Sequence, residues 1–129
     1  MSNEPFKSNY DLEERTAVFG EDVIRFCRKA KRDPLVLSLL TQLIRSATSI
    51  GANYMEANGA SSPKDFGNKI YICKKEAQES KHWLRMLSNY YPEDKEELRK
   101  YWKEAQEFVL IFHKIVSTLK SKNSLKSLK

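Results

Sequence analysis

The stretch VLSLLTQLIRSATSIGANY, residues 36–54, carries an apolar or small side chain at alternating intervals of four and three residues. Because an α-helix turns by about 100° per residue, this interval keeps those side chains on one stripe of a helix. The stripe consists of Val36, Leu40, Leu43, Ala47, Ile50 and Tyr54. The stretch therefore predicts a long helix whose stripe faces a protein core.

The same interval occurs in three further segments of the chain. Their stripes are Leu12, Thr16, Phe19, Val23, Phe26 and Ala30; Phe66, Ile70, Cys73, Ala77, Ser80, Leu84 and Leu87; and Leu98, Trp102, Ala105, Val109, Phe112, Val116 and Leu119. Four such stripes in a chain of this length predict an all-α fold. We expect an antiparallel up-and-down four-helix bundle, with residues 1–120 forming a single domain.

Capping and turn residues separate the four helices. Asp33-Pro34 and Ser62-Pro63 are typical of helix starts, because a capping side chain is followed by proline in the first turn. Asn58-Gly59 is typical of a helix end, and Pro92 separates the third helix from the fourth. These signals predict helices near 11–32, 34–58, 63–90 and 93–120, joined by short connections, and a basic flexible tail over 121–129.

The composition, with 40% hydrophobic and 31% charged residues, is typical of a soluble globular protein. The sequence has no run of about 18 apolar residues and no signal-peptide pattern, so we expect a cytoplasmic protein without membrane contact. Cys27 and Cys73 lack metal-ligand spacing and fall on or beside apolar helix faces, which predicts two reduced cysteines in the core. The formal net charge is +6, and the segment 120–129 supplies four lysines and no acid.

The predicted second helix differs from the others because Arg45 and Glu56 are its only ionisable side chains with formal charge. Opposite its apolar stripe, a solvent-facing helix would normally be rich in lysine and glutamate. The residues found there are mostly small or uncharged, and Arg45 and Glu56 are the two exceptions. The candidates for contact on this face are Gln42, Arg45, Ser49, Ala52, Asn53 and Glu56. We predict that this face is an oligomer interface, and the alternative is a solvated face of low charge.

Signatures of catalysis and of metal binding are missing from the sequence. Glu79-x-x-His82 matches half of a di-iron bundle motif, but Leu110 stands where His113 would need a second glutamate. We expect His82 near the surface and Glu79 in an internal polar contact. No phosphate-cradling glycine loop and no convincing nucleophile–base pair is present. The sequence predicts no catalytic residue, no metal site and no cofactor.

Two basic features are candidates for nucleic-acid binding. The first is a stripe at the end of the first helix, which consists of Arg25, Arg28, Lys29, Lys31 and Arg32. The second is a cluster in the tail, which consists of Lys120, Lys122, Lys126 and Lys129. Such residues bind phosphate backbones by releasing counterions. The alternative for the stripe is a solvated face that complements the helix dipole, and the tail's alternative role is solubility. Tyr90, Tyr91, Tyr101 and Trp102 are candidates for base stacking, although a packing cluster at the helix ends is the favoured interpretation.

A longer motif surrounds the opening stretch. QLIRSATSIGANYMEANGASSPKDF, residues 42–66, combines Arg45 with Gly51-Ala52-Asn53, Glu56-Ala57 and Gly59, and KKEAQESKHWLRML follows at residues 74–87. Both segments resemble the bacterial family of 23S rRNA intervening sequence proteins. The resemblance implies a left-handed up-and-down bundle that assembles as a homopentamer. It also suggests association with RNA or DNA, because a similar bundle, the accessory protein of diversity-generating retroelements, works with a reverse transcriptase and nucleic acid.

Two hypotheses of function follow. The first is a non-catalytic oligomeric bundle that associates with nucleic acid, RNA from the ribosome included, or with a nucleoprotein complex. The second is a protein–protein assembly module that has a protein partner and binds no nucleic acid.

Overall fold

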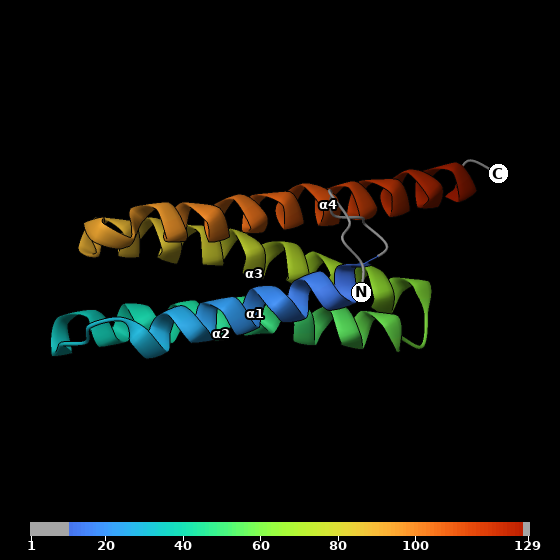
Figure 1. Cartoon of the computed structure of the whole chain (residues 1–129). Coiled ribbons are helices and arrows are strands. Elements are labelled where there is room, and N and C mark those ends of the chain that lie inside the picture. Colours follow the sequence, from blue (N-terminus) through green and yellow to red (C-terminus); the bar gives the residue numbers. More distant parts are fainter. Residues whose placement is uncertain (1–10, 128–129) are drawn as a thin grey trace.

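The computed structural model describes residues 11–127 and consists of four long helices and one short 3-10 helix (Figure 1). The helices are α1 (Leu12–Lys29), α2 (Pro34–Asn58), α3 (Pro63–Tyr90), η2 (Pro92–Asp94) and α4 (Lys95–Ser127). The described part of the chain contains no strand. The predicted all-α four-helix bundle is therefore confirmed.

The ends of α1 and α4 differ from the prediction. Helix α1 ends at Lys29 instead of residue 32, since Ala30 and the capping residue Asp33 are both extended and lead into Pro34. Helix α4 begins at Lys95, after η2, and continues to Ser127. The predicted flexible tail thus begins too early, because residues 121–127 contain no glycine or proline that would stop the helix. Residues 128–129 lie outside the described part.

The predicted caps are present at both proline-led helices. The Asp33 carboxylate accepts hydrogen bonds from the backbone N–H groups of Leu35 and Val36, at 2.9 and 3.3 Å. The Ser62 hydroxyl accepts one from the N–H of Asp65 at 3.0 Å. These bonds satisfy amide groups that have no partner within the helix, and so they define where α2 and α3 begin.

The four stripes form the core, but the fourth is rotated relative to the prediction. Tyr101 and Phe108 are buried on α4, whereas Trp102 is 36% exposed. Two sets of residues at helical spacing share Leu98, Ala105 and Phe112, and the observed set brings two aromatic rings, Tyr101 and Phe108, into the core where the predicted set had only Trp102. The Phe108 ring meets Phe19 of α1 edge to face, with the ring centres 5.5 Å apart. The predicted packing role of Trp102 is therefore wrong.

Successive helices are neighbours along the bundle, and α2 packs against both α1 and α3. Helices α1 and α4 approach less closely and are joined mainly by side chains. Arg15 of α1, only 6% exposed, donates to Glu104 and Glu107 of α4 at 2.9 and 2.8 Å. This buried guanidinium and the Phe19–Phe108 contact hold the two ends of the chain together.

Helix α2 is the most apolar of the four. By length and composition alone it would be able to cross a membrane, which differs from the prediction that no segment would qualify. Its apolar stripe, however, is buried in the bundle between α1 and α3. That double contact accounts for the apolar stripe, whereas Leu35, Leu37, Thr41, Thr48, Ala52 and Met55 remain exposed and uncharged on the outer face.

Candidate nucleic-acid interface

The basic stripe predicted on α1 is exposed, but it is partly neutralised. Arg25 forms an ion pair with Asp22 at 2.8 Å, and Lys29 forms one with Glu97 of α4 at 2.7 Å. Arg32 donates to the backbone carbonyl of Arg28 at the end of α1, as the dipole alternative predicts. Lys31 is also exposed. The stripe is thus in part a set of contacts that stabilise the end of α1.

The predicted tail lysines divide between described and undescribed positions. Lys120 and Lys122 are exposed on the last turns of α4. Lys126 belongs to the same helix, but its side chain is outside the described residues, as is all of Lys129. Lys120 lies beside the groove between α4 and the start of α3.

The polar residues of the α2 motif find their partners within the same chain. Arg45 donates to Glu76 at 3.0 Å and to Glu79 at 2.5 Å, both on α3, and to Gln42 at 3.2 Å. Glu56 pairs with Lys69 of α3 at 2.7 Å. Asn53 donates to the carbonyl of Ser49. A polar contact of Glu79 is present as predicted, but it lies at the surface and not inside the bundle, since the Arg45 and Glu79 side chains are 46% and 36% exposed. Arg45 and Glu56 link α2 to α3.

Small residues of the motif permit close approach between helices. The hydroxyl groups of Ser46 and Ser80, both fully buried, are 2.9 Å apart across α2 and α3. On the other side of α2, a Cβ atom added to Gly51 would stand 3.3 Å from Oγ1 of Thr16 on α1. Ser49 remains half-buried and Ala52 exposed. Most of the small side chains therefore serve packing inside the bundle, and Ala52 remains open to a partner.

An exposed tryptophan stands among cations on the face formed by α3 and α4. Trp102 lines a shallow depression with Ser88 and four exposed cations, and no acidic residue lines it. The cations are Arg85 on α3 and Lys95, Arg99 and Lys103 on α4. Lys81 Nζ lies 4.7 Å from the centre of the Trp102 ring. We call Trp102 with these four lining cations the Trp102 surface.

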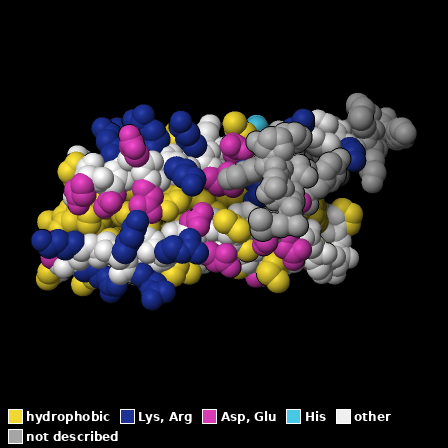
Figure 2. Space-filling model, in the orientation of Figure 1, with side chains coloured by type: hydrophobic (Ala, Val, Ile, Leu, Met, Phe, Trp, Pro, Cys, Tyr) yellow, Lys and Arg dark blue, Asp and Glu magenta, His cyan; other side chains and the backbone are white. Residues whose placement is uncertain are grey.

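Base stacking by Trp102 was predicted only as the alternative to packing in the core stripe, and no role was predicted for the cations around it. The signal was present in the spacing of Lys95, Arg99, Trp102 and Lys103, which places all four on neighbouring turns of one helix face. Figure 2 shows Lys and Arg side chains gathered at the end of the molecule where α1 ends and α4 begins.

Both histidines are exposed, and no salt bridge within the described part of the chain joins either to a carboxylate. His82 lies at the surface, as expected, and meets Trp83 edge to face with the ring centres 4.9 Å apart. Nδ1 of His113 faces the Lys74 ammonium at 3.0 Å, and Nε2 lies 3.5 Å from the Ser117 hydroxyl. A catalytic histidine needs an acceptor that orients the ring and stabilises the imidazolium, and an ammonium group supplies neither effect. No group of three metal-ligating side chains occurs in the described residues.

Both cysteines are buried as free thiols, which confirms their predicted place in the core. Burial raises the pKa of Cys27 to about 11 and that of Cys73 to about 12. Because the thiolate is the reactive form of cysteine, neither residue is suited to nucleophilic chemistry near neutral pH.

The comparisons with known proteins agree with the architecture. The family model described as "23S rRNA-intervening sequence protein" matches residues 9–114, which include the α2 motif and Trp102. The chain belongs to this family. The resemblance seen in the α2 motif is thereby confirmed, whereas the link to retroelement accessory proteins stays a prediction.

A solved family relative has a similar structure. A crystal structure from Bacteroides thetaiotaomicron, of a protein with unknown function from the S23 ribosomal protein family, shares 28% sequence identity with this chain. The alignment covers 81% of this chain and 97% of that one, with a TM-score of 0.71. No curated protein matches the sequence significantly. The match over most of both chains makes the bundle a shared structure within the family.

Proposed function

We propose that this intervening sequence protein is a non-catalytic, oligomeric bundle that associates with nucleic acid, RNA in particular, through the Trp102 surface. The observation that carries the proposal is the exposed Trp102 ring among four exposed cations with no acid lining the depression. Cations bind the phosphate backbone by counterion release, and an exposed aromatic ring stacks on an unpaired base. The family's description, which refers to 23S rRNA, favours RNA as the partner.

The carboxylates of the bundle support a role without catalysis. Glu76 and Glu79 are held by Arg45, and Glu104 is held by Arg15. A general acid or base must be able to exchange its proton with a substrate, and a carboxylate engaged by a guanidinium is poorly placed for that. These acids therefore serve the assembly of the bundle.

The oligomer is part of the proposal, and the resemblance to the family makes a homopentamer the expected form. On α2, Met55 is 63% exposed, and Ala52 is exposed one turn before it; Leu35, at the start of the helix, is 78% exposed. Exposed apolar side chains along one helix are typical of a surface that another chain covers. Ala52 permits a close approach because its side chain is small.

The experiment that tests nucleic-acid association uses Trp102 as its own reporter. In a Trp83→Phe background the remaining tryptophan fluorescence comes from Trp102 alone, because the chain has two tryptophans. Titration with single-stranded RNA at low salt should quench this fluorescence, and added salt should reverse the quenching. Arg99→Gln with Lys103→Gln should weaken binding, while the matched control Arg25→Gln with Arg28→Gln should bind almost normally. Unchanged fluorescence together with no retarded band in a gel shift would contradict the proposal.

A protein–protein assembly module remains the second candidate, on a specific observation. Ile24 and Leu37 are exposed apolar residues on either side of a groove between α1 and α2, which Leu40 and Ile44 also line. A protein partner docking there would bury these side chains. The ultraviolet absorbance ratio of protein purified at low salt separates the candidates, because only the first predicts co-purifying nucleic acid.

A further inference from the structure

The junction of α3 and α4 carries two separate depressions, the Trp102 surface and a second one between the start of α3 and the end of α4, and no acidic side chain of the described residues lines either. We call these two depressions and the helix junction between them the α3–α4 groove. Helix α3 has three acidic residues, Asp65, Glu76 and Glu79. On its helical wheel all three lie on the half opposite α4. Glu76 and Glu79 bond Arg45 there, and Asp65 interacts electrostatically with Lys69. The acids of α3 therefore leave its α4-facing side to neutral and basic residues.

The acids of α4 are segregated in the same way. Glu104 and Glu107 reach Arg15 of α1, and Glu97 reaches Lys29 of α1. Glu96 lies on the outer side of α4, where it lines a different depression together with Glu104, Glu107, Lys100 and the outer sides of Arg99 and Lys103. The ion pairs that join the ends of the chain thus also remove negative charge from the α3–α4 groove.

Cations continue along this groove beyond the Trp102 surface. Lys81 follows Arg85 on α3, and its ammonium bonds Gln106 across the groove. Lys74 then meets His113 of α4. Lys64 and Lys120 line the far end. No ion pair in the described part of the chain involves any of these four lysines, so their charges are available to an anion.

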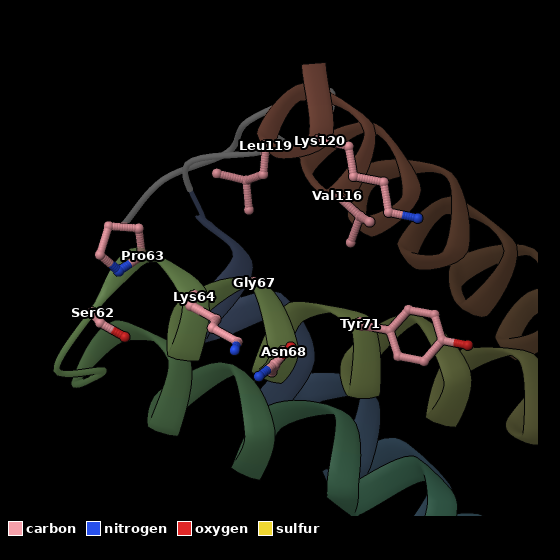
Figure 3. Close-up of a pocket in the computed structure, with 9 residues that line it drawn as sticks. All are labelled: Ser62, Pro63, Lys64, Gly67, Asn68, Tyr71, Val116, Leu119 and Lys120. Atoms are coloured by element: carbon pink, nitrogen blue, oxygen red, sulfur yellow. The ribbon is translucent and has the colours of Figure 1, made fainter. Parts of the chain in front are cut away.

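The far end of the groove holds a second exposed aromatic ring. Tyr71 is 54% exposed and lines a depression of about 690 Å³ between the start of α3 and the end of α4 (Figure 3). Val116 and Leu119 extend from α4 toward α3, where Gly67 leaves room for them. A Cβ atom added to Gly67 would stand 3.4 Å from Cδ1 of Leu119, which is ordinary van der Waals contact, so Leu119 packs directly over Gly67.

We infer that the α3–α4 groove is a track for about ten nucleotides of a single-stranded nucleic acid, with Trp102 and Tyr71 as two stacking positions. This inference rests on the proposed function, because it extends the Trp102 surface. Lys64 lines one depression and Ser88 the other, so the two depressions together span about 36 Å of α3 at about 1.5 Å per residue. At about 3.4 Å per nucleotide of a stacked strand, that length accommodates about ten nucleotides.

The two aromatic rings favour a single strand over a duplex. Trp102 lies beside Lys81, and Lys81 is ten residues from Tyr71 on α3, so the rings are about 15 Å apart along the groove. Stacking requires unpaired bases, and a duplex keeps its bases paired inside the helix. Backbone contact and stacking are common to RNA and DNA, and so the recognised chemistry is the phosphate chain with its unpaired bases.

The test compares the affinities of short and long oligonucleotides for the full-length Trp83→Phe protein. Fluorescence anisotropy gives the affinities of labelled U4, U12, dT12 and a 12-base-pair RNA duplex, and Trp102 quenching is recorded in parallel. We expect U12 to bind at least about tenfold more tightly than U4, and the duplex to bind more weakly than U12. Tyr71→Ala should weaken U12 by about 5- to 150-fold, the range for losing one stacked base, and should leave U4 quenching of Trp102 within twofold. Tyr71→Phe, which keeps the ring, is the matched control and should retain U12 affinity.

The outcomes distinguish a failure of the track from a failure of the proposed function. If U4 and U12 bind equally, or if Tyr71→Ala leaves U12 unaffected, the track is wrong, while Trp102 quenching still supports the proposed function. If no oligonucleotide binds, both are wrong. A duplex that binds as well as U12 also overturns the track. Equal affinity for dT12 and U12, with the same loss in Tyr71→Ala, supports a track for either nucleic acid, whereas loss of dT12 binding alone supports one for RNA.

Discussion

At the residue scale, the central contact of the α2 motif is Arg45 with Glu76. Glu76 is 7% exposed, whereas the Arg45 side chain is 46% exposed. The carboxylate is thus the buried member, and the guanidinium is its partner at the surface. A buried carboxylate that loses its hydrogen-bond donor keeps its desolvation cost. The motif arginine is therefore expected to act first on stability.

We predict that Arg45→Met destabilises the protein by about 1–2 kcal/mol, less than for a fully buried pair because Arg45 is partly solvated. Urea unfolding followed by circular dichroism measures the change. Glu76→Gln in the Arg45→Met background should recover part of the loss, because the neutral amide is less costly to bury. Arg25→Gln, which removes an exposed pair with Asp22, is the control and should have a smaller effect. Equal effects of Arg45→Met and Arg25→Gln would show that the α2–α3 contact is unimportant.

A second residue-scale prediction concerns Gly51. Alanine gains helix propensity but brings Cβ to 3.3 Å from Thr16 Oγ1, so Gly51→Ala should be close to neutral. Gly51→Leu must separate α1 from α2 and should cost about 1–3 kcal/mol. Thermal unfolding of both variants checks this order. A neutral Gly51→Leu would mean that α1 and α2 do not pack as closely as the structure has them.

At the element scale, α1 and α4 are held together by side chains that titrate. Burial acts to raise the pKa of Glu97, but hydrogen bonds from Lys29 and Tyr101 outweigh it and lower that pKa. Burial and the bond to Glu97 raise the pKa of Tyr101. A carboxylate whose pKa falls on folding stabilises the folded state above its unfolded pKa, and that contribution disappears as pH falls through the folded value.

We therefore predict that part of the stability is lost below about pH 4.5, the ordinary pKa of a glutamate, as Glu97 becomes protonated. Glu97→Gln should lower the free energy of unfolding at pH 7. Below about pH 4.5 the free energy of unfolding of this variant should depend less on pH than that of the wild type. Glu96→Gln, an exposed neighbour on the same helix, is the matched control and should keep the wild-type profile. Parallel profiles for wild type and Glu97→Gln would contradict the assignment.

The elements also show where sequence reasoning succeeds and where it stops. Capping residues such as Asp33 and Ser62 act on amides two or three residues away, so the starts of α2 and α3 were predictable. The rotation of α4 was not, because the stripes through Trp102 and through Phe108 share half of their members and only packing against Phe19 selects one. The partners of Arg45 are 31 and 34 residues away and need the register of α2 against α3.

At the scale of the whole molecule, charge is sorted among the faces of the bundle. Acids on α3 face Arg45 of α2, and acids on α4 face Arg15 and Lys29 of α1. Among the described residues, no ion pair joins a cation of the α3–α4 groove to a carboxylate, although Arg99 and Lys103 also line a neighbouring depression with Glu96, Glu104 and Glu107. The sequence alone gives the charge balance of each helix but not which helix each charge faces, and for that reason the predicted nucleic-acid contacts were the basic stripe on α1 and the lysines of the tail.

The assembly belongs to this scale too. Light scattering should give a mass several times 15.1 kDa, and five times that value for the homopentamer. Ala52→Glu should dissociate the assembly and leave the helical signal in circular dichroism largely intact, because Ala52 is exposed in the single chain. Ala17→Glu, at an exposed position on α1, is the matched control. A monomeric wild-type protein would contradict the proposed oligomer.

The most direct test of the central claim is the salt dependence of RNA binding. For single strands, a plot of the logarithm of the association constant against the logarithm of salt concentration has a slope of about −0.7 per phosphate contact. The four lining cations therefore predict a slope of about −3. Arg99→Gln with Lys103→Gln should make the slope shallower by about 1.4, and Arg25→Gln with Arg28→Gln should leave it unchanged. Binding that ignores salt, or a slope that responds to the α1 variant and not to the α4 variant, would contradict the account.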